Sequence, residues 1–258
     1  MQTALPALFI SHGAPTLILE PGTTRSFLTS LGQSLPRPKA IIAISAHWTT
    51  HQPTVTSTHY PETIHDFGGF PDELYQMTYP APGSPQLAER VQQALHQQGI
   101  AVQQDSQRGL DHGAWVPLKL IYPLADIPVI QLSVQPNLSP AHHLAIGKAL
   151  APLRTEDVLI LASGSATHNL RDFFGRPIDA EMPAYVEQFN NWLITSILNN
   201  DQAALLDYQH QGPHAVQNHP TPEHLLPLFV AMGAGLKPEL LHNAATYGVI
   251  SMAAFAWH

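Results

Sequence analysis

The 258-residue sequence contains no cysteine. This absence excludes disulfide bonds, cysteine nucleophiles and metal centres held by thiolates, including iron–sulfur clusters and cysteine-ligated zinc. Any metal ion bound by this chain must therefore be held by nitrogen and oxygen ligands.

Charged residues are also scarce, at 12% of the chain, and 11 lysines and arginines against 19 aspartates and glutamates give a formal net charge of −8. Because nucleic-acid binding depends on clustered basic side chains, this balance predicts no nucleic-acid partner. Hydrophobic residues make up 44% of the chain, which is typical of a packed globular protein. We interpret residues 1–258 as a single domain.

Long hydrophobic runs are missing too. The longest apolar stretches, near Ala40 to Ala46 and Val158 to Ala162, fall far short of the roughly 20 residues that span a bilayer, so we expect no membrane helix. The N-terminal segment MQTALPALFISHG lacks the basic region of a signal peptide, and we expect a cytoplasmic protein. No heptad pattern is present, so the sequence leaves the oligomeric state open.

Short apolar runs alternate with helical patterns along the chain. The runs have the character of strands buried on both faces: Ala7 to Ile10, Ala40 to Ile44, Val129 to Val134, Val158 to Ala162, and Gly248 to Met252 as a candidate antiparallel strand. Helical patterns cover 84–99, 139–153, 184–199 and 222–232. This alternation predicts an α/β fold, a three-layer α/β/α domain with a mixed, largely parallel central sheet.

Histidine is the unusual component, because its 16 copies outnumber all lysines and arginines together. Histidine binds metals and exchanges protons near neutral pH, so the excess suggests catalysis. Several copies lie in polar or proline-flanked segments, where we interpret them as solvated side chains without a role: His51, His59, His142, His143, His210 and His258.

Three predicted strands each end in a polar cluster that contains a histidine, in the sequences SHG, SAHW and SGSATHN. The histidines are His12, His47 and His168. Ligands of open α/β sheets bind beyond the carboxyl ends of the strands, so these side chains are predicted to converge there. The alternative for each is a structural histidine that hydrogen-bonds the backbone.

A fourth candidate lies in the segment HPTPEH. Thr221 is interpreted as a helix N-cap with Pro222 at the first helical position, which puts Glu223 and His224 in the first turn. His224 would complete a nitrogen-rich metal site, with Glu223 as an oxygen ligand or as a partner that orients a ligand. Alternatively, Glu223 only complements the helix dipole.

Two acid–histidine pairs complete the set. In LDHGAW, ahead of a strand-like run, Asp111 is a candidate to orient His112 for acid–base work, and the alternative is an aspartate that caps backbone amides. In IHDFGGF, His65 and Asp66 lie in a Pro- and Gly-rich segment, 61–85, that suits a lid over an aromatic substrate or is simply an ordered turn.

Motifs for other chemistries are missing from the chain. It has neither a dinucleotide nor a phosphate-binding glycine loop, and no HExxH. Its SGS sequence after a strand lacks the full nucleophile-elbow pattern, which leaves a serine hydrolase as a weak alternative.

Taken in order, the segments PALFISHGAPT, AIIAISAHWTT, TIHDFGGFPDELYQMTYPAPGSP, GLDHGAWVPL, ASGSATHNLR and NHPTPEHLLPL resemble the class III extradiol ring-cleavage dioxygenases, in particular those of the 4,5-DOPA dioxygenase extradiol type. The resemblance covers nearly the whole chain. It implies an enzyme that opens the ring of a DOPA-like catechol with O2 to a muconic semialdehyde-type product.

The resemblance also implies roles for individual residues. His12, His47 and His224 correspond to the ligands of a non-haem Fe(II), with Zn(II) able to occupy the site in purified protein. His168 corresponds to the acid–base catalyst and is a candidate further ligand. His112 corresponds to a residue near the metal or the substrate. Two alternatives remain: a zinc hydrolase that uses the same histidines, and a metal-binding protein without chemistry.

Overall fold

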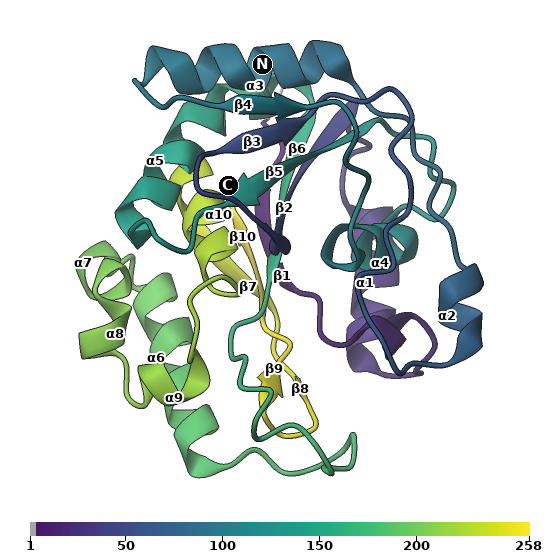
Figure 1. Cartoon of the computed structure of the whole chain (residues 1–258). Coiled ribbons are helices and arrows are strands. Elements are labelled where there is room, and N and C mark those ends of the chain that lie inside the picture. Colours follow the sequence, from purple (N-terminus) through teal and green to yellow (C-terminus); the bar gives the residue numbers. More distant parts are fainter. Residues whose placement is uncertain (1–3) are drawn as a thin grey trace.

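A central sheet of eight strands organises the computed structural model, which describes residues 4–258 (Figure 1). Its strands are β1 (Ala7–Ser11), β2 (Ala40–Thr49), β3 (Thr54–Thr56), β4 (Gln103–Asp105), β5 (Val129–Val134), β6 (Val158–Gly164), β7 (Pro238–His242) and β10 (Ala254–Trp257). They lie in the order β4-β3-β5-β2-β6-β1-β10-β7. The central strands β5, β2, β6 and β1 are parallel, whereas β10 is antiparallel to β1 and β7. The predicted mixed, largely parallel sheet is confirmed.

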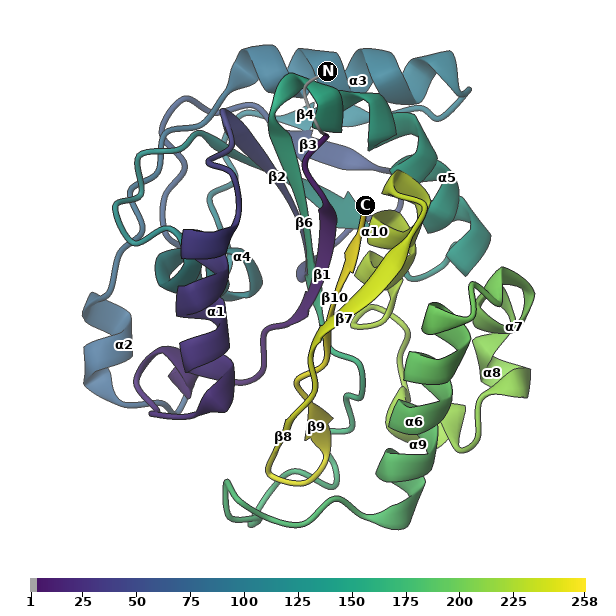
Figure 2. The same ribbon diagram turned by 180° about the vertical axis from the view of Figure 1, so that it is seen from behind.

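Helices cover both faces of the sheet (Figure 2). They are α1 (Thr23–Ser34), α2 (Asp72–Gln76), α3 (Pro85–Gln97), α4 (His112–Ile121), α5 (Pro140–Leu150), α6 (Ala184–Leu198), α7 (Gln202–Leu206), α8 (Tyr208–Gln211), α9 (Ala215–Asn218) and α10 (Leu226–Ala234), with 3-10 turns at η1 (Pro15–Ile18) and η2 (Ala151–Glu156). In the described part of the chain, no helix combines the length and the apolar character needed to cross a membrane.

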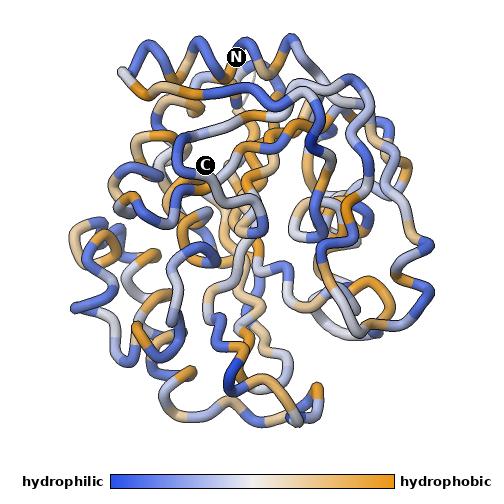
Figure 3. The backbone as a smooth tube through the Cα atoms, viewed as in Figure 1, coloured by the Kyte–Doolittle hydropathy of each residue, from blue (hydrophilic) through white to orange (hydrophobic). Residues whose placement is uncertain are grey.

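The two faces of the sheet enclose two hydrophobic cores, because successive strand residues point to opposite sides. Leu8 of β1 packs in one core with Leu28 of α1, and its neighbour Phe9 packs in the other with Phe229 of α10. Burial on both faces explains why the central strands are continuously apolar, and hydrophobic segments gather in them (Figure 3).

The C-terminal strands differ from the prediction. The run from Gly248 to Met252 forms only the short β9 (Ile250–Ser251), which pairs with β8 (Ala245–Thr246) outside the main sheet. The Thr167 side chain also bonds the backbone of this run. Its Oγ1 donates to Val249 O and accepts from Ser251 N–H. The antiparallel strand beside β1 is β10, four residues that the sequence pattern did not reveal.

Two helices also differ from the prediction. The predicted strand-like run after Asp111 is helix α4, despite Pro117 within it. Proline lacks the N–H that would bond the carbonyl four residues earlier, and that carbonyl, Gly113 O, accepts instead from Ser163 Oγ. Helix α10 begins at Leu226 rather than at Pro222. Thr221 is therefore not its N-cap, and its hydroxyl donates to Glu223 Oε1 at 2.8 Å.

Candidate metal centre

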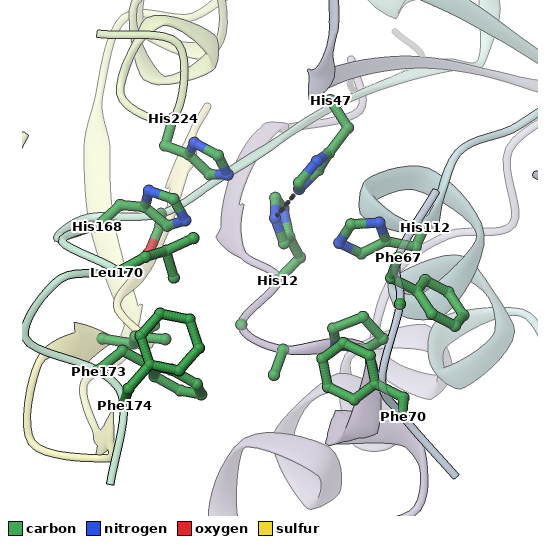
Figure 4. Close-up of a pocket in the computed structure, with 16 residues that line it drawn as sticks. His12, His47, Phe67, Phe70, His112, His168, Leu170, Phe173, Phe174 and His224 are labelled. Atoms are coloured by element: carbon green, nitrogen blue, oxygen red, sulfur yellow. Dashed lines mark hydrogen bonds between the residues drawn. The ribbon is translucent and has the colours of Figure 1, made fainter. Parts of the chain in front are cut away.

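Two histidines lie where central strands end. His12 follows β1 directly and His47 lies near the end of β2, and both strands run parallel to β6 between them. Because parallel strands end at the same edge of a sheet, the two rings meet, with 3.0 Å between His12 Nε2 and His47 Nε2 (Figure 4). The structure brings these two side chains together as the sequence predicts.

His224 reaches the same point from the turn before α10. Ligand nitrogens of His12, His47 and His224 all lie within 4.8 Å of one another. The turn packs closely on the end of β6, where Ser165 N–H donates to the His224 carbonyl at 2.9 Å. A Cβ on Gly164 would lie 2.1 Å from that carbonyl oxygen, so this approach requires glycine.

Hydrogen bonds fix which nitrogen of two of these rings carries the proton. The Ser163 hydroxyl donates to Gly113 O, so its oxygen accepts from His12 Nδ1–H at 2.9 Å. A carboxylate can only accept, and Glu223 Oε1 lies 3.0 Å from His224 Nδ1. With the proton on Nδ1, each ring presents the lone pair of Nε2.

The single carboxylate of Asp66 contacts two histidines, His112 and His47. Its Oδ1 accepts from both the backbone N–H and Nδ1–H of His112, each at 2.9 Å, and its Oδ2 lies 3.6 Å from His47 Nδ1. The carboxylate thus favours Nδ1–H in both rings and leaves Nε2 of His47 free for a ligand. The adjacent His and Asp in IHDFGGF were a visible signal, but the sequence did not reveal which histidines Asp66 contacts.

Three imidazole lone pairs therefore face one small space. Within residues 4–258, His224 Nε2 is buried without a hydrogen-bond partner, and His12 Nε2 and His47 Nε2 are two acceptors 3.0 Å apart. Burial lowers the pKa of His12 and of His224 well below the usual value and the pKa of His47 to about 3. All three rings are consequently neutral near pH 7, the form that binds metals, and this nitrogen set fits a divalent ion such as iron or zinc.

His168 stacks on His224, with 3.4 Å between ring centroids and 8° between planes. Its backbone N–H donates to Asn218 O at 2.9 Å, which holds the loop after β6 in place. Burial lowers the pKa of His168 to about 4, so this ring too is neutral near pH 7. His168 also shares a candidate metal-binding group with Glu223 and His224, which leaves both its predicted roles open.

Asp111 does not orient His112, and this prediction is wrong. Asp111 is fully buried as the N-cap of α4, where Oδ1 accepts from Ala114 N–H and from Ser45 Oγ. Its Oδ2 accepts from Gln131 Nε2 at 2.8 Å. The capping alternative is correct, and the orienting carboxylate of His112 is Asp66.

One histidine predicted to be solvated is buried. His143 is 0% exposed, donates from Nδ1 to Ser139 O at 3.1 Å and accepts Gln135 N–H at Nε2, also at 3.1 Å. The helix α5 turns this residue toward the core, a direction that the polar sequence around it concealed. Most of the others on that list are exposed, as expected: His51, His59, His210 and His258.

An apolar pocket of about 260 Å³ opens beside the histidine cluster. Phe67 and Phe70, from the segment 61–85, form one wall, and Phe173 and Phe174 face them from the other side (Figure 4). The Gly-rich segment that the sequence suggested as a lid is thus part of the pocket wall. The pocket places an apolar space directly against the convergent nitrogens.

Known proteins share this chain's sequence and fold. A family model described as the catalytic LigB subunit of aromatic ring-opening dioxygenase matches residues 6–256. A 4,5-DOPA dioxygenase extradiol of Beta vulgaris is 46% identical over 254 residues, 96% of this chain and 94% of the relative. One of Escherichia coli (strain K12) is 41% identical over 237 residues, 90% of this chain and 86% of the relative.

The fold comparison agrees. The crystal structure of an uncharacterized protein from Escherichia coli K12 superimposes with a TM-score of 0.82 at 36% identity, covering 98% of this chain and 100% of that one. These matches extend over nearly all of the sequence, and the range of the family model spans the positions of His12, His47 and His224. The chain belongs to the LigB family of extradiol aromatic ring-opening dioxygenases.

Proposed function

We propose that this protein opens the ring of catechols with O2, using Fe(II) held by Nε2 of His12, His47 and His224. The observation that carries the proposal is the convergence of three neutral imidazoles, buried at His12 and His224 and partly buried at His47, at the wall of an aromatic pocket. Relatives are named for DOPA, a catechol with a side chain on the ring. We therefore propose a ring-substituted, DOPA-like catechol, cleaved beside one hydroxyl-bearing carbon to a muconic semialdehyde-type product.

The Nε2 atoms of His12, His47 and His224 would hold the Fe(II), which would supply a Lewis-acidic, redox-active centre for the reaction of the catechol with O2. To bind the metal, the ligand nitrogens must be unprotonated and their lone pairs must point toward the ion. Ser163, Asp66 and Glu223 ensure this from behind the rings, because each favours the proton on the remote Nδ1.

His168 is proposed as the acid–base residue. A neutral imidazole at the pocket edge can accept the proton of a catechol hydroxyl as the substrate binds and can return it to oxygen later in the reaction. Its pKa of about 4 keeps it in the accepting form near pH 7.

His112 is proposed to contact the substrate. It lines the pocket, and its ring centroid lies 3.9 Å from that of His47. Because Nδ1 donates to Asp66, its Nε2 is the nitrogen left to accept a hydrogen bond from a substrate hydroxyl. The phenylalanines that line the pocket would pack against the substrate ring beside these groups.

Oxygen uptake tests the proposal directly. Protein loaded anaerobically with Fe(II) is mixed with a catechol in aerated buffer in an oxygen electrode, and one O2 per catechol should be consumed with formation of a yellow product. The Zn(II) form is the control and should consume none. Ester or amide hydrolysis by the Zn(II) form, with no oxygen uptake by the Fe(II) form, would replace the proposal with a hydrolase.

A further inference from the structure

Two residues at the end of α9 hold the loop that carries His168. The backbone carbonyl of Asn218, the last residue of α9, accepts from His168 N–H at 2.9 Å. The next residue, His219, reaches the same loop with its side chain, and its Nε2 lies 2.9 Å from Ala166 O. Since a carbonyl oxygen can only accept, the proton of His219 lies on Nε2. The loop is thus bonded at His168 and again two residues before it.

His219 is buried, with 3% of its surface exposed, and it lies outside both the pocket lining and the candidate metal-binding groups of residues 4–258. Its ring packs against Phe189 and Tyr208, with centroids 5.5 and 6.3 Å away. Burial lowers the pKa of His219 to about 4, so the ring is neutral near pH 7 and carries the single proton that Ala166 O accepts. His219 therefore acts on the site through the loop.

One nitrogen sets His219 apart from a structural histidine. Its Nδ1 is buried without a hydrogen-bond partner in the described part of the chain, residues 4–258. His143, which is also buried, uses both of its ring nitrogens. Because a buried nitrogen without a partner lowers the stability of the fold, the contribution of the His219 imidazole is the bond from Nε2 to the loop.

The position of the His168 ring follows from that of its backbone. The ring stacks on His224 with 3.4 Å between centroids (Figure 4), and a stacking contact is compatible with a range of offsets. Acid–base transfer requires a nitrogen within hydrogen-bond reach of the substrate proton. A misplacement of about 1 Å can cost on the order of 100-fold in rate. The bonds that hold the loop therefore determine how well His168 can transfer a proton.

We propose that His219 is a positioning residue for the acid–base group, because its bond to Ala166 O fixes the loop that places His168 at the pocket. This inference rests on the proposed ring-opening function, in which His168 exchanges the substrate proton. Without that bond the loop keeps its connection at His168 N–H but is released two residues earlier. The ring then shifts relative to the substrate, while the proposed metal ligands, which lie on other segments, stay in place.

Two amide variants separate the hydrogen bond from the volume of the ring. The amide nitrogen of His219→Gln has about the reach of Nε2 and can donate to Ala166 O, whereas that of His219→Asn is one carbon too short. We expect His219→Asn to lower kcat for oxygen uptake by the Fe(II) enzyme about 10- to 100-fold, and His219→Gln to stay within about threefold of wild type. KM and metal content should stay near wild type in both, because the loss concerns proton transfer rather than binding.

Hydrogen exchange tests the loop without relying on turnover. Amide exchange of a peptide that spans residues 165–169 is compared in the Zn(II) forms, and it should be about tenfold or more faster in His219→Asn than in wild type or His219→Gln. His143→Asn is the matched control, because it replaces a buried histidine of α5 that is bonded to Ser139 O and Gln135 N–H. It should lower the melting temperature and leave both kcat and the exchange of 165–169 unchanged.

Wild-type kcat and exchange in His219→Asn would overturn the inference. A kcat in His219→Gln as low as in His219→Asn would also overturn it, because the volume of the ring rather than its bond would then matter. Loss of the metal in His219→Asn would mean that the residue supports His224 instead. If wild-type protein takes up no oxygen with any catechol, the ring-opening function fails, while the exchange result still decides whether His219 holds the loop.

Discussion

Two buried histidines, His224 and His143, differ in the hydrogen bonding of one ring nitrogen, Nε2. Both rings are almost inaccessible to solvent, and both are held through Nδ1, by Glu223 Oε1 and Ser139 O respectively. The Nε2 of His143 accepts a backbone N–H from Gln135, whereas the Nε2 of His224 has no partner within the described residues 4–258.

Because a buried polar atom without a partner is costly, the comparison separates a structural histidine from one prepared for a ligand. Burial alone does not make that distinction. For these two residues, the distinction lies in the hydrogen-bond partner of Nε2.

Replacing His224 should have the largest effect. His224→Ala removes one of the three proposed ligand nitrogens, so we expect metal affinity to fall more than about 100-fold, beyond the loss typical of a residue that only supports a ligand. Metal content after dialysis against a weak chelator, measured by atomic emission, reports the result. His210→Ala, on the surface with its side chain 81% exposed, is the control. Full metal retention in His224→Ala would remove His224 from the ligand set.

His168→Ala should separate catalysis from metal binding. If His168 is an acid–base group, metal content stays at the wild-type level while kcat for ring opening falls about 10²- to 10⁴-fold. Loss of the metal in this variant would instead assign His168 as a ligand, in agreement with its position beside Glu223 and His224.

Asp66→Asn tests the carboxylate that supports two rings. The amide can place an N–H against Nδ1 of His112 or His47 and so disturb the favoured tautomer. We expect a 10- to 100-fold loss of metal affinity or activity. Asp111→Asn is the matched comparison, because Asp111 caps α4 and touches neither ring nitrogen. Asp111→Asn should lower the melting temperature and leave metal affinity near the wild-type value. A loss of metal affinity without a change in melting temperature would contradict the role assigned to Asp111.

The central sheet and part of the candidate site could be predicted from sequence for the same reason. Buried parallel strands need continuous apolar runs, and their carboxyl ends meet at one edge, so the placement of His12 and His47 followed from local pattern. The C-terminal strand β10 could not, because its four residues gain their strand conformation from pairing with β1.

Long-range contacts account for what the sequence missed at the site. Asp111 adjoins His112 in sequence, yet Asp66, 46 residues away, accepts the hydrogen bond from its ring. Similarly, the polar surroundings of His143 indicated exposure, but the direction of its side chain depends on how α5 packs against α10 and the segment after β5. Adjacency in sequence predicts neither the partner of a side chain nor the direction in which a helix turns it.

The smallest expected effect concerns His143 and the stability of the fold. Burial lowers its pKa from 6.5 to about 4, and protonation of Nε2 would set two N–H groups against each other, since that nitrogen accepts Gln135 N–H. With the folded pKa below the unfolded value, His143 contributes stability above pH 6.5 that is lost as the pH falls toward 4. Between pH 7.5 and 5.5 this loss amounts to roughly 1 kcal/mol.

His143→Gln removes the titrating group and retains a side chain able to donate and accept. Urea unfolding of the two proteins at pH 7.5 and 5.5 should therefore show a smaller loss of unfolding free energy in the variant, by roughly 1 kcal/mol. Other buried histidines titrate equally in both proteins. The difference between the two proteins in how much unfolding free energy is lost between pH 7.5 and 5.5 therefore reports on His143. An equal loss of unfolding free energy in the two proteins would mean that His143 can take up a proton in the folded state. The hydrogen bond at its Nε2 would then no longer distinguish His143 from His224.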